Sequence, residues 1–317
     1  MKNVLSPACF TQAVEAARQG PYAAGAATSR PWLRLAAFIA VAAALLVLAV
    51  FALVAAKMAA PGLIDEGLMV ESAPQGVVWP LDREAAFLAL LASTLMAAAL
   101  VLLAAAMIVY QRGPGAFLWP WRGRQWGLLA VGFAVMAVLA LLSWPLALLL
   151  EPDAVGPMFN AAEPMQARLT YAGFAALWLF IAAAAEEIAF RGVLLRITGG
   201  LFRQVWLICL VNGLLFSAIH FDPDPVAFVA RALSGAVWTW AALRLGGIGF
   251  AVGAHWANNL FIALLIEPMS TAALPGRGIP VEYLALEVVT CAVVFVTVEV
   301  LARRRDRRDA ATADGAS

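Results

Sequence analysis

Apolar stretches of about 20 residues, the length that a helix needs to cross the hydrocarbon core of a bilayer, recur along this chain. Their length limits the folds that the chain can adopt. Hydrophobic residues make up 64% of the chain and charged residues 13%, whereas an ordinary globular protein carries about 25% charged residues. The sequence therefore predicts an integral membrane protein.

Eight segments have the length and composition of membrane-spanning helices. They cover about residues 35–56, 85–110, 126–150, 170–197, 204–220, 225–243, 247–266 and 282–302. No alternating strand pattern is present, and a helix satisfies its own backbone hydrogen bonds inside a bilayer. We expect an all-α, polytopic membrane helix bundle, with about eight transmembrane helices around an intramembrane polar cavity.

The basic residues concentrate in alternate loops, which predicts the orientation of the chain. Most of the 21 Lys and Arg residues precede the first segment, lie between the second and third, surround the connection from the fourth to the fifth, or follow the sixth and the eighth. The opposite loops carry acidic residues instead, namely Asp65, Glu66, Glu71, Glu151, Asp153, Glu163, Asp222 and Asp224. The positive-inside rule places both termini in the cytoplasm, which agrees with an even number of spans. We expect a multi-pass protein of the cell membrane.

The segments divide the chain into four parts. These are a cytoplasmic N-terminal arm (1–34), three N-terminal transmembrane helices (35–167), a core of five helices (168–302) and a basic, disordered cytoplasmic tail (303–317). In the arm, Pro7 and Gly20 bound a short stretch that forms either an interfacial helix or a poorly ordered segment. The tail's arginines follow a membrane span, and this position explains them without a nucleic-acid partner.

The ionisable residues inside the predicted spans are the strongest functional signal. The chain has only two histidines, His220 and His255, and both lie within predicted spans, as do the adjacent Glu186 and Glu187. Ionisable residues at bilayer depth are costly and by default mark a functional site. Taken singly, each also has a structural interpretation: the glutamates could snorkel to the interface, and a histidine could hydrogen-bond another helix.

Helix geometry separates the two glutamates. Adjacent residues point about 100° apart around a helix, and Glu187 stands four residues before Arg191, the favoured order for an ion pair. This pair would leave Glu186 facing a cavity. His255 and Asn259 are also four residues apart and share one helix face. If the fourth segment stays helical to about residue 197, Glu186 and both histidines lie at similar depths.

Two kinds of chemistry fit these side chains. A carboxylate and a histidine could activate a water molecule, while His255 and Asn259 donate hydrogen bonds to an oxyanion, as amide hydrolysis requires. Alternatively, Glu186, His220 and His255 could be three ligands of a metal ion, with water in the fourth position. The sequence leaves both open.

Three motifs together resemble a known family. They are Glu186-Glu187-x-x-x-Arg191, Phe216-x-x-x-His220 and His255-x-x-x-Asn259, and they resemble the signature of the CPBP family, the CAAX protease and bacteriocin-processing membrane proteins, also called Abi. These proteins are similar to the type II CAAX prenyl endopeptidases. The resemblance covers about residues 168–266 and does not include the first three spans.

The resemblance implies an intramembrane endopeptidase that cleaves a membrane-associated or lipidated, CAAX-type peptide or protein. Carried over by position, Glu186 is the general base, His220 helps to activate the water, and His255 and Asn259 stabilise the oxyanion. Glu187, Arg191 and Phe216 support the site. The family is labelled as metalloproteases, so we expect one divalent metal ion, with zinc as the first choice. The alternative is a metal-free glutamate mechanism.

Two other classes of function use the same buried groups. One is an ion- or proton-coupled transporter, although such proteins usually contain internal repeats and none is visible here. The other is a non-catalytic membrane partner or immunity protein. In each case the lipid bilayer is a partner, and no nucleic acid is expected.

Overall fold

The computed structural model describes residues 7–20, 29–59, 79–120, 125–150, 156–272 and 278–314. Over these residues every regular element is a helix, in agreement with the predicted all-α fold. Several charged residues that entered the orientation argument lie outside the described residues: Lys2, Asp65, Glu66, Glu71, Arg122, Arg124, Glu151, Asp153 and Arg277.

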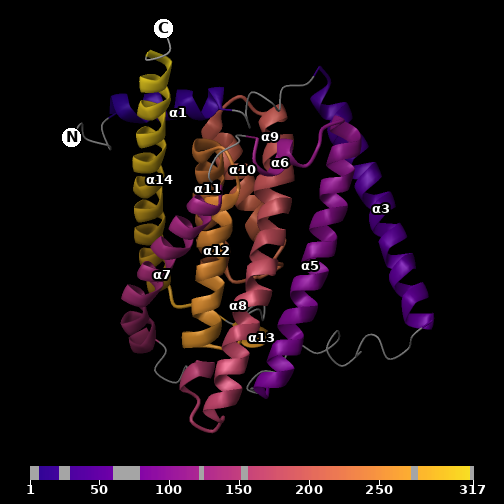
Figure 1. The fold of residues 1–317 in the computed structure, drawn as a ribbon, viewed down its shortest axis with the longest axis vertical. Helices are drawn as coiled ribbons and strands as arrows, with labels where there is room; N and C mark the ends of the chain where they lie inside the picture. The colour runs from indigo at the N-terminus through magenta and orange to yellow at the C-terminus, as the bar shows by residue number, and fades with distance from the viewer. Residues whose placement is uncertain are drawn as a thin grey trace.

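The longer helices run along the bundle and are joined by short helical turns (Figure 1). The α-helices are α1 (Pro7–Gln19), α3 (Pro31–Ala59), α5 (Leu81–Tyr110), α6 (Gly115–Leu118), α7 (Gln125–Leu150), α8 (Met165–Glu187), α9 (Leu195–Leu201), α10 (Val205–Ala218), α11 (Pro225–Leu245), α12 (Gly249–Phe261), α13 (Met269–Ala272) and α14 (Glu282–Asp314). A 3-10 turn, η1 (Pro157–Phe159), and two π-helical segments, η2 (Ile188–Leu194) and η3 (Ile262–Ile266), complete the described elements.

Seven helical segments among the described residues are long and apolar enough to cross a membrane. This makes the chain a multi-pass membrane protein. The fifth predicted span, residues 204–220, is the exception, because α10 has only 14 residues. At ~1.5 Å per residue it is about 21 Å long, short of the ~30 Å hydrocarbon core. It packs against α11 instead, as the short arm of a helical hairpin.

The fourth segment remains helical from Met165 to Leu201, because η2 joins α8 to α9 without a break. This continuity meets the condition under which the glutamates and histidines were expected at similar depths. Through η2 and α9 the chain continues from the end of α8 to the end of the bundle where α1 lies (Figure 1).

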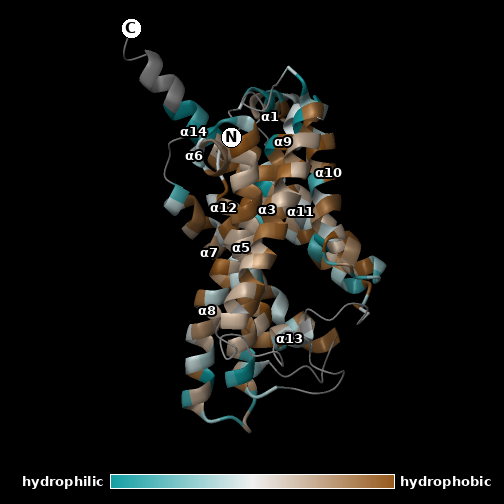
Figure 2. Ribbon diagram, turned by 90° about the vertical axis from the view of Figure 1, so that its right-hand side faces the viewer, coloured by the Kyte–Doolittle hydropathy of each residue, from teal (hydrophilic) through white to brown (hydrophobic). Residues whose placement is uncertain are grey.

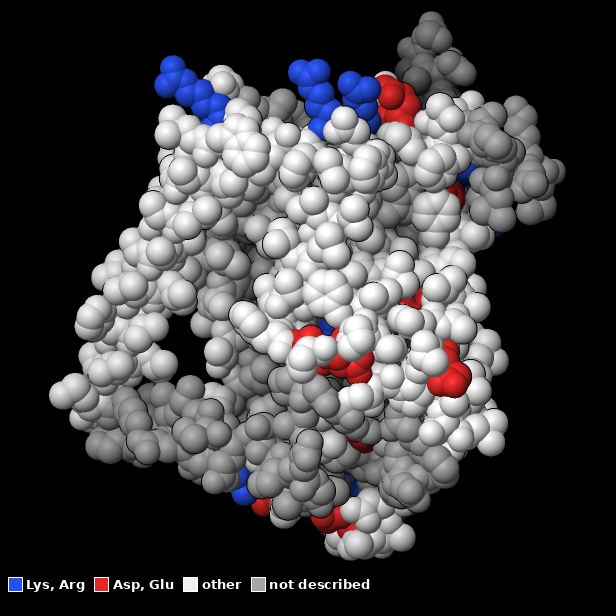
Figure 3. Space-filling view, turned by 180° about the vertical axis from the view of Figure 1, so that it is seen from behind, with Lys and Arg blue, Asp and Glu red and all other residues white. Residues whose placement is uncertain are grey.

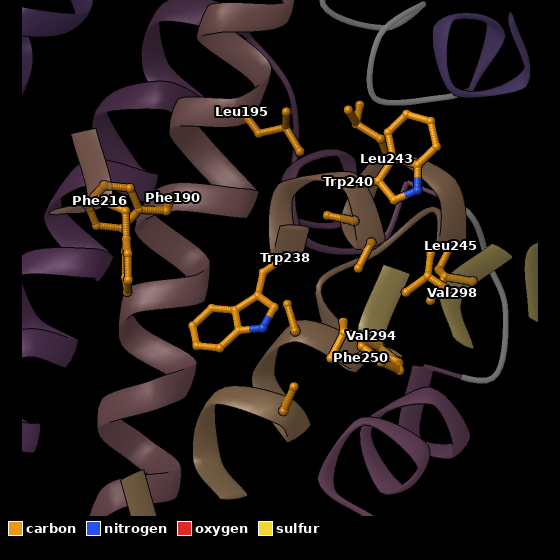
Figure 4. Packing of buried hydrophobic residues seen from close by; sticks show 14 of the residues in the cluster. Phe190, Leu195, Phe216, Trp238, Trp240, Leu243, Leu245, Phe250, Val294 and Val298 are labelled. Atoms are coloured by element: carbon orange, nitrogen blue, oxygen red, sulfur yellow. The ribbon is translucent and has the colours of Figure 1, made fainter. Parts of the chain in front are cut away.

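The core is apolar and lies between α8, α10, α11, α12 and α14. Large side chains such as Phe216, Trp238 and Phe250 fill it (Figure 4). Hydrophobic residues also cover the outer faces of the helices, while hydrophilic residues gather mainly at the ends (Figure 2). This distribution is expected when the outer faces contact lipid instead of water.

Helix α1 and the last part of α14 meet at the same end of the bundle. Phe10 of α1 stacks on Trp240 at a ring-centroid distance of 6.4 Å, and Arg303 of α14 donates to the Cys9 carbonyl at 3.3 Å. Lys and Arg side chains protrude at this end (Figure 3). Of the two alternatives for the N-terminal arm, the structure shows the helix, which covers Pro7–Gln19. The tail differs from expectation, because α14 continues through the arginine cluster to Asp314.

Candidate active site

Two π-helical segments lie next to the predicted site residues. Glu186 and Glu187 end α8, and η2 begins at Ile188. The second segment, η3, begins at Ile262, three residues after Asn259. Single-turn π segments inside helices are rare and occur frequently at functional sites, because each one changes the direction in which the neighbouring side chains point.

Glu187 is the centre of a buried polar network that joins four elements, α8, η2, α11 and α12. Its Oε1 accepts a hydrogen bond from Arg191 Nη1 at 2.9 Å and one from His255 Nδ1 at 3.0 Å. Arg191 is fully buried and also donates from Nη2 to the Gly235 carbonyl at 3.0 Å. The predicted ion pair of Glu187 and Arg191 is thus present. Its contact with His255 was not predicted, and it holds the imidazole in one orientation.

Glu186 faces the other nitrogen of the same imidazole. Because Nδ1 of His255 donates to Glu187, its Nε2 is left toward Glu186, whose Oε2 lies 3.9 Å away. Among the described residues this Oε2 is buried and has no hydrogen-bond partner. A carboxylate oxygen in this state is available to a water molecule or a substrate, as the geometric prediction for Glu186 required.

His220 lies in the turn just beyond α10, held by a backbone contact. Its Nδ1 is 2.8 Å from the Phe216 carbonyl; because a carbonyl only accepts, Nδ1 carries the proton and Nε2 is left as an acceptor. Burial lowers the pKa of this imidazole, which favours the neutral ring. The Phe216 ring lies 5.2 Å from the His220 ring and 5.8 Å from that of His255.

Asn259 lies one helical turn beyond His255 on α12. Its Oδ1 accepts from Asn258 Nδ2 at 3.2 Å, so its own amide NH2 remains available as a donor. Both asparagines reach the same cavity as the histidines.

One cavity of about 540 Å³ brings the four predicted catalytic residues together. Glu186, His220, His255 and Asn259 all line it, from α8, α12 and the turn after α10. The supporting Phe216 also lines it, whereas Glu187 and Arg191 lie fully buried behind its wall. A volume of several hundred Å³ is typical of ligand sites. The predicted polar cavity within the bundle is therefore observed.

Several lining residues were not assigned to the site from the sequence, among them Asp222, Arg231 and Trp238. Arg231 of α11 pairs with Asp222 at 2.8 Å, so an ion pair joins these two side chains at the cavity wall. Trp238 packs against the His255 ring, with the two ring centroids 4.8 Å apart. The sequence could have indicated Asp222 as a cavity residue, because it follows His220 by only two residues.

The donor atoms suit zinc in type but not in placement. Carboxylate oxygen and imidazole nitrogen are zinc ligands, and Glu186, His220 and His255 were the predicted set. Within the part of the chain that the structure describes, however, no three His, Cys, Asp or Glu groups stand where they could hold a metal ion. A metal stays a prediction, and no step below passes through one.

The comparisons with known proteins agree with the family resemblance that the three motifs predicted. Residues 168–261 match the family model described as type II CAAX prenyl endopeptidase Rce1-like. The chain carries an Rce1-like segment. This segment contains all three motifs, so the predicted resemblance is confirmed over these residues. At the level of the family, the match supports a CAAX-type intramembrane protease.

A curated relative is also similar to part of the chain. A stretch of 154 residues is 32% identical to the uncharacterized protein YyaK of Bacillus subtilis (strain 168). The stretch covers 46% of the present chain and 48% of that relative, so the chain spans about half of the relative's length. No solved structure matches the chain.

Proposed function

We propose that the protein is an intramembrane endopeptidase that hydrolyses a peptide bond of a membrane-associated peptide or protein. The observation that carries the proposal is the shared cavity, in which an unpartnered buried Glu186 oxygen faces His255 Nε2. The Rce1-like match over residues 168–261 supports the same class of reaction.

Glu186 acts as the general base in this proposal. Its carboxylate takes a proton from a water molecule, and the water oxygen forms a bond to the carbonyl carbon of the substrate. The neutral His220, with its Nδ1 proton on the Phe216 carbonyl, accepts a second hydrogen bond from the water at Nε2 and so orients it.

The oxyanion forms opposite the base and needs donors. The Asn259 amide supplies one. His255 supplies a second from Nε2 when both ring nitrogens carry a proton, while Nδ1 stays on the Glu187 carboxylate. When the carbon–nitrogen bond breaks, Glu186 returns its proton to the leaving amine. Donors already aimed at the developing charge are usually the largest catalytic contribution.

The test is peptide cleavage by the purified protein in detergent and in liposomes. Glu186→Gln keeps the shape of the side chain but cannot accept the proton, so we expect cleavage to fall at least ~100-fold, as removal of a general base does. The variant should elute and melt like the parent protein. Cleavage at the parent rate by folded Glu186→Gln would refute the proposal.

The same cleavage assay with a chelator tests whether the activity needs a metal ion. The protein-only mechanism predicts equal rates before and after exhaustive dialysis against a chelator. Loss of activity on chelation, with recovery on adding zinc, would instead favour the metal version of the same site.

A further inference from the structure

A second carboxylate faces the cavity from a helix outside the three motifs. Glu287 of α14 lines the same cavity as Glu186. Two side chains hold it: the Ser234 hydroxyl of α11 and the Cys291 thiol both donate to Oε1 of Glu287, the thiol at 3.1 Å. Because both donors use one oxygen, Oε2 is left without a hydrogen-bond donor among the described residues.

The two aspartates that line this cavity already have partners within the protein. Asp222 pairs with Arg231, and Asp224 accepts the backbone N–H groups of Val226 and Ile279 at 2.7 and 2.6 Å. For Glu287, by contrast, no Lys, Arg or His among the described residues stands at ion-pair distance. Arg231 is the only lysine or arginine among the described lining residues, and its partner neutralises it.

The lining therefore favours a positive group in the substrate. A cavity walled by one sign of charge concentrates ligands of the opposite sign, and a low dielectric strengthens each interaction. An isolated carboxylate is costly to bury, so a cation that reached Glu287 would relieve this cost. A free carboxylate at the same place would be repelled by it.

We propose that Glu287, held by Ser234 and Cys291, binds a lysine or arginine side chain close to the scissile bond of the substrate. The inference rests on the proposed peptidase function and adds a substrate class to it: peptides with a basic residue beside the cleaved bond. The cavity volume of about 540 Å³ allows a few residues of a peptide to reach both Glu186 and Glu287.

The experiment compares peptides that differ at one position. Peptides with lysine, norleucine or glutamate beside the scissile bond are offered to the parent protein and to Glu287→Gln. We expect the parent to prefer lysine over norleucine by about tenfold in kcat/KM, equivalent to ~1.4 kcal/mol, and to cleave the glutamate peptide least. Glu287→Gln should cleave the lysine and norleucine peptides with about equal kcat/KM, because the amide is uncharged.

The matched control is Glu282→Gln. Glu282 lies on the same helix, is exposed and does not line the cavity, so its variant should keep the preference of the parent. An equal lysine preference in the parent and in Glu287→Gln would overturn the inference, and so would a parent protein without any preference.

A binding measurement separates this inference from the proposed function. Titration calorimetry of the same peptides uses Glu186→Gln and the double variant Glu186→Gln/Glu287→Gln, neither of which needs turnover. Tighter binding of lysine to the single variant, lost in the double variant, supports the Glu287 subsite even if the parent cleaves nothing. In that case the peptidase proposal alone fails. If the parent cleaves the lysine and norleucine peptides equally well and both variants bind them equally, the peptidase proposal stands and the Glu287 subsite is refuted.

Discussion

Glu186 and Glu187 are neighbours in sequence with different surroundings in the structure. Glu187 is fully buried and accepts hydrogen bonds from Arg191 and His255, whereas Glu186 Oε2 has no partner among the described residues. The cause is the ~100° between consecutive helical residues. One carboxylate thus anchors the site while the next stays available to water.

Glu187 should behave as a positioning residue. Glu187→Gln keeps the size of the side chain but removes the charge opposite Arg191 and the anionic acceptor for His255 Nδ1. We expect kcat to fall about 10- to 100-fold, as for partners that orient a functional histidine, with little change in KM. Steady-state kinetics on the variant measure both constants. A lower melting temperature with unchanged kcat would mean that Glu187 is only structural.

At the scale of elements, close helix packing sets the position of His255. A Cβ at Gly253 of α12 would lie 2.0 Å from the Leu129 carbonyl oxygen of α7, and a Cβ at Gly132 would lie 2.2 Å from that of Phe250. These glycines let the two backbones approach, as small residues do between membrane helices. Gly253 stands two residues before His255, so the α7–α12 contact and the site are coupled.

Gly253→Ala should therefore damage both stability and activity. The methyl group must displace backbone atoms, and overpacking of this kind costs about 1–3 kcal/mol. Thermal unfolding in detergent and peptide cleavage measure the two effects. Gly173→Ala on α8 is the matched control, since nothing lies within 4 Å of its Cβ, and it should behave like the parent. Equal melting temperatures for the two variants would contradict the packing argument.

At the scale of the whole molecule, the cavity lies between the long spans and extends to the segments that connect them, at Asp222, Asp224 and Gly278. Acidic side chains reach the surface about halfway between the two ends of the bundle (Figure 3), and the cavity is lined from α5, α7, α8, α11, α12 and α14. The short α10 contributes to this arrangement, since it places His220 in a turn between two helices.

The orientation of the molecule can be tested with thiol labelling. The positive-inside rule predicts that α1 faces the cytoplasm, and the turn between α7 and α8 then faces the opposite side. In a background without Cys9, Cys209 and Cys291, an impermeant reagent added to right-side-out vesicles should label Glu163→Cys at once. Arg18→Cys should react only after permeabilisation. The reverse pattern would invert the predicted topology.

The sequence by itself determined which residues lie in the membrane and which of them are chemically unusual. The lengths of the apolar runs located seven spans, and the helical spacing of Glu187 and Arg191 predicted their ion pair, because both features are local. The motifs likewise pointed to Glu186, His220, His255 and Asn259 without any knowledge of packing.

Only the tertiary structure decided how the helices turn toward one another. The contact of Glu187 with His255 joins residues 68 positions apart, and Glu287 enters the cavity from a helix beyond the Rce1-like segment. The helix α10 is also shorter than the apolar run of residues 204–220, because the chain turns at Ile219 and α10 packs along α11. The rotation and approach of helices depend on interlocking side chains across the bundle, and a local pattern contains no information about these distant partners.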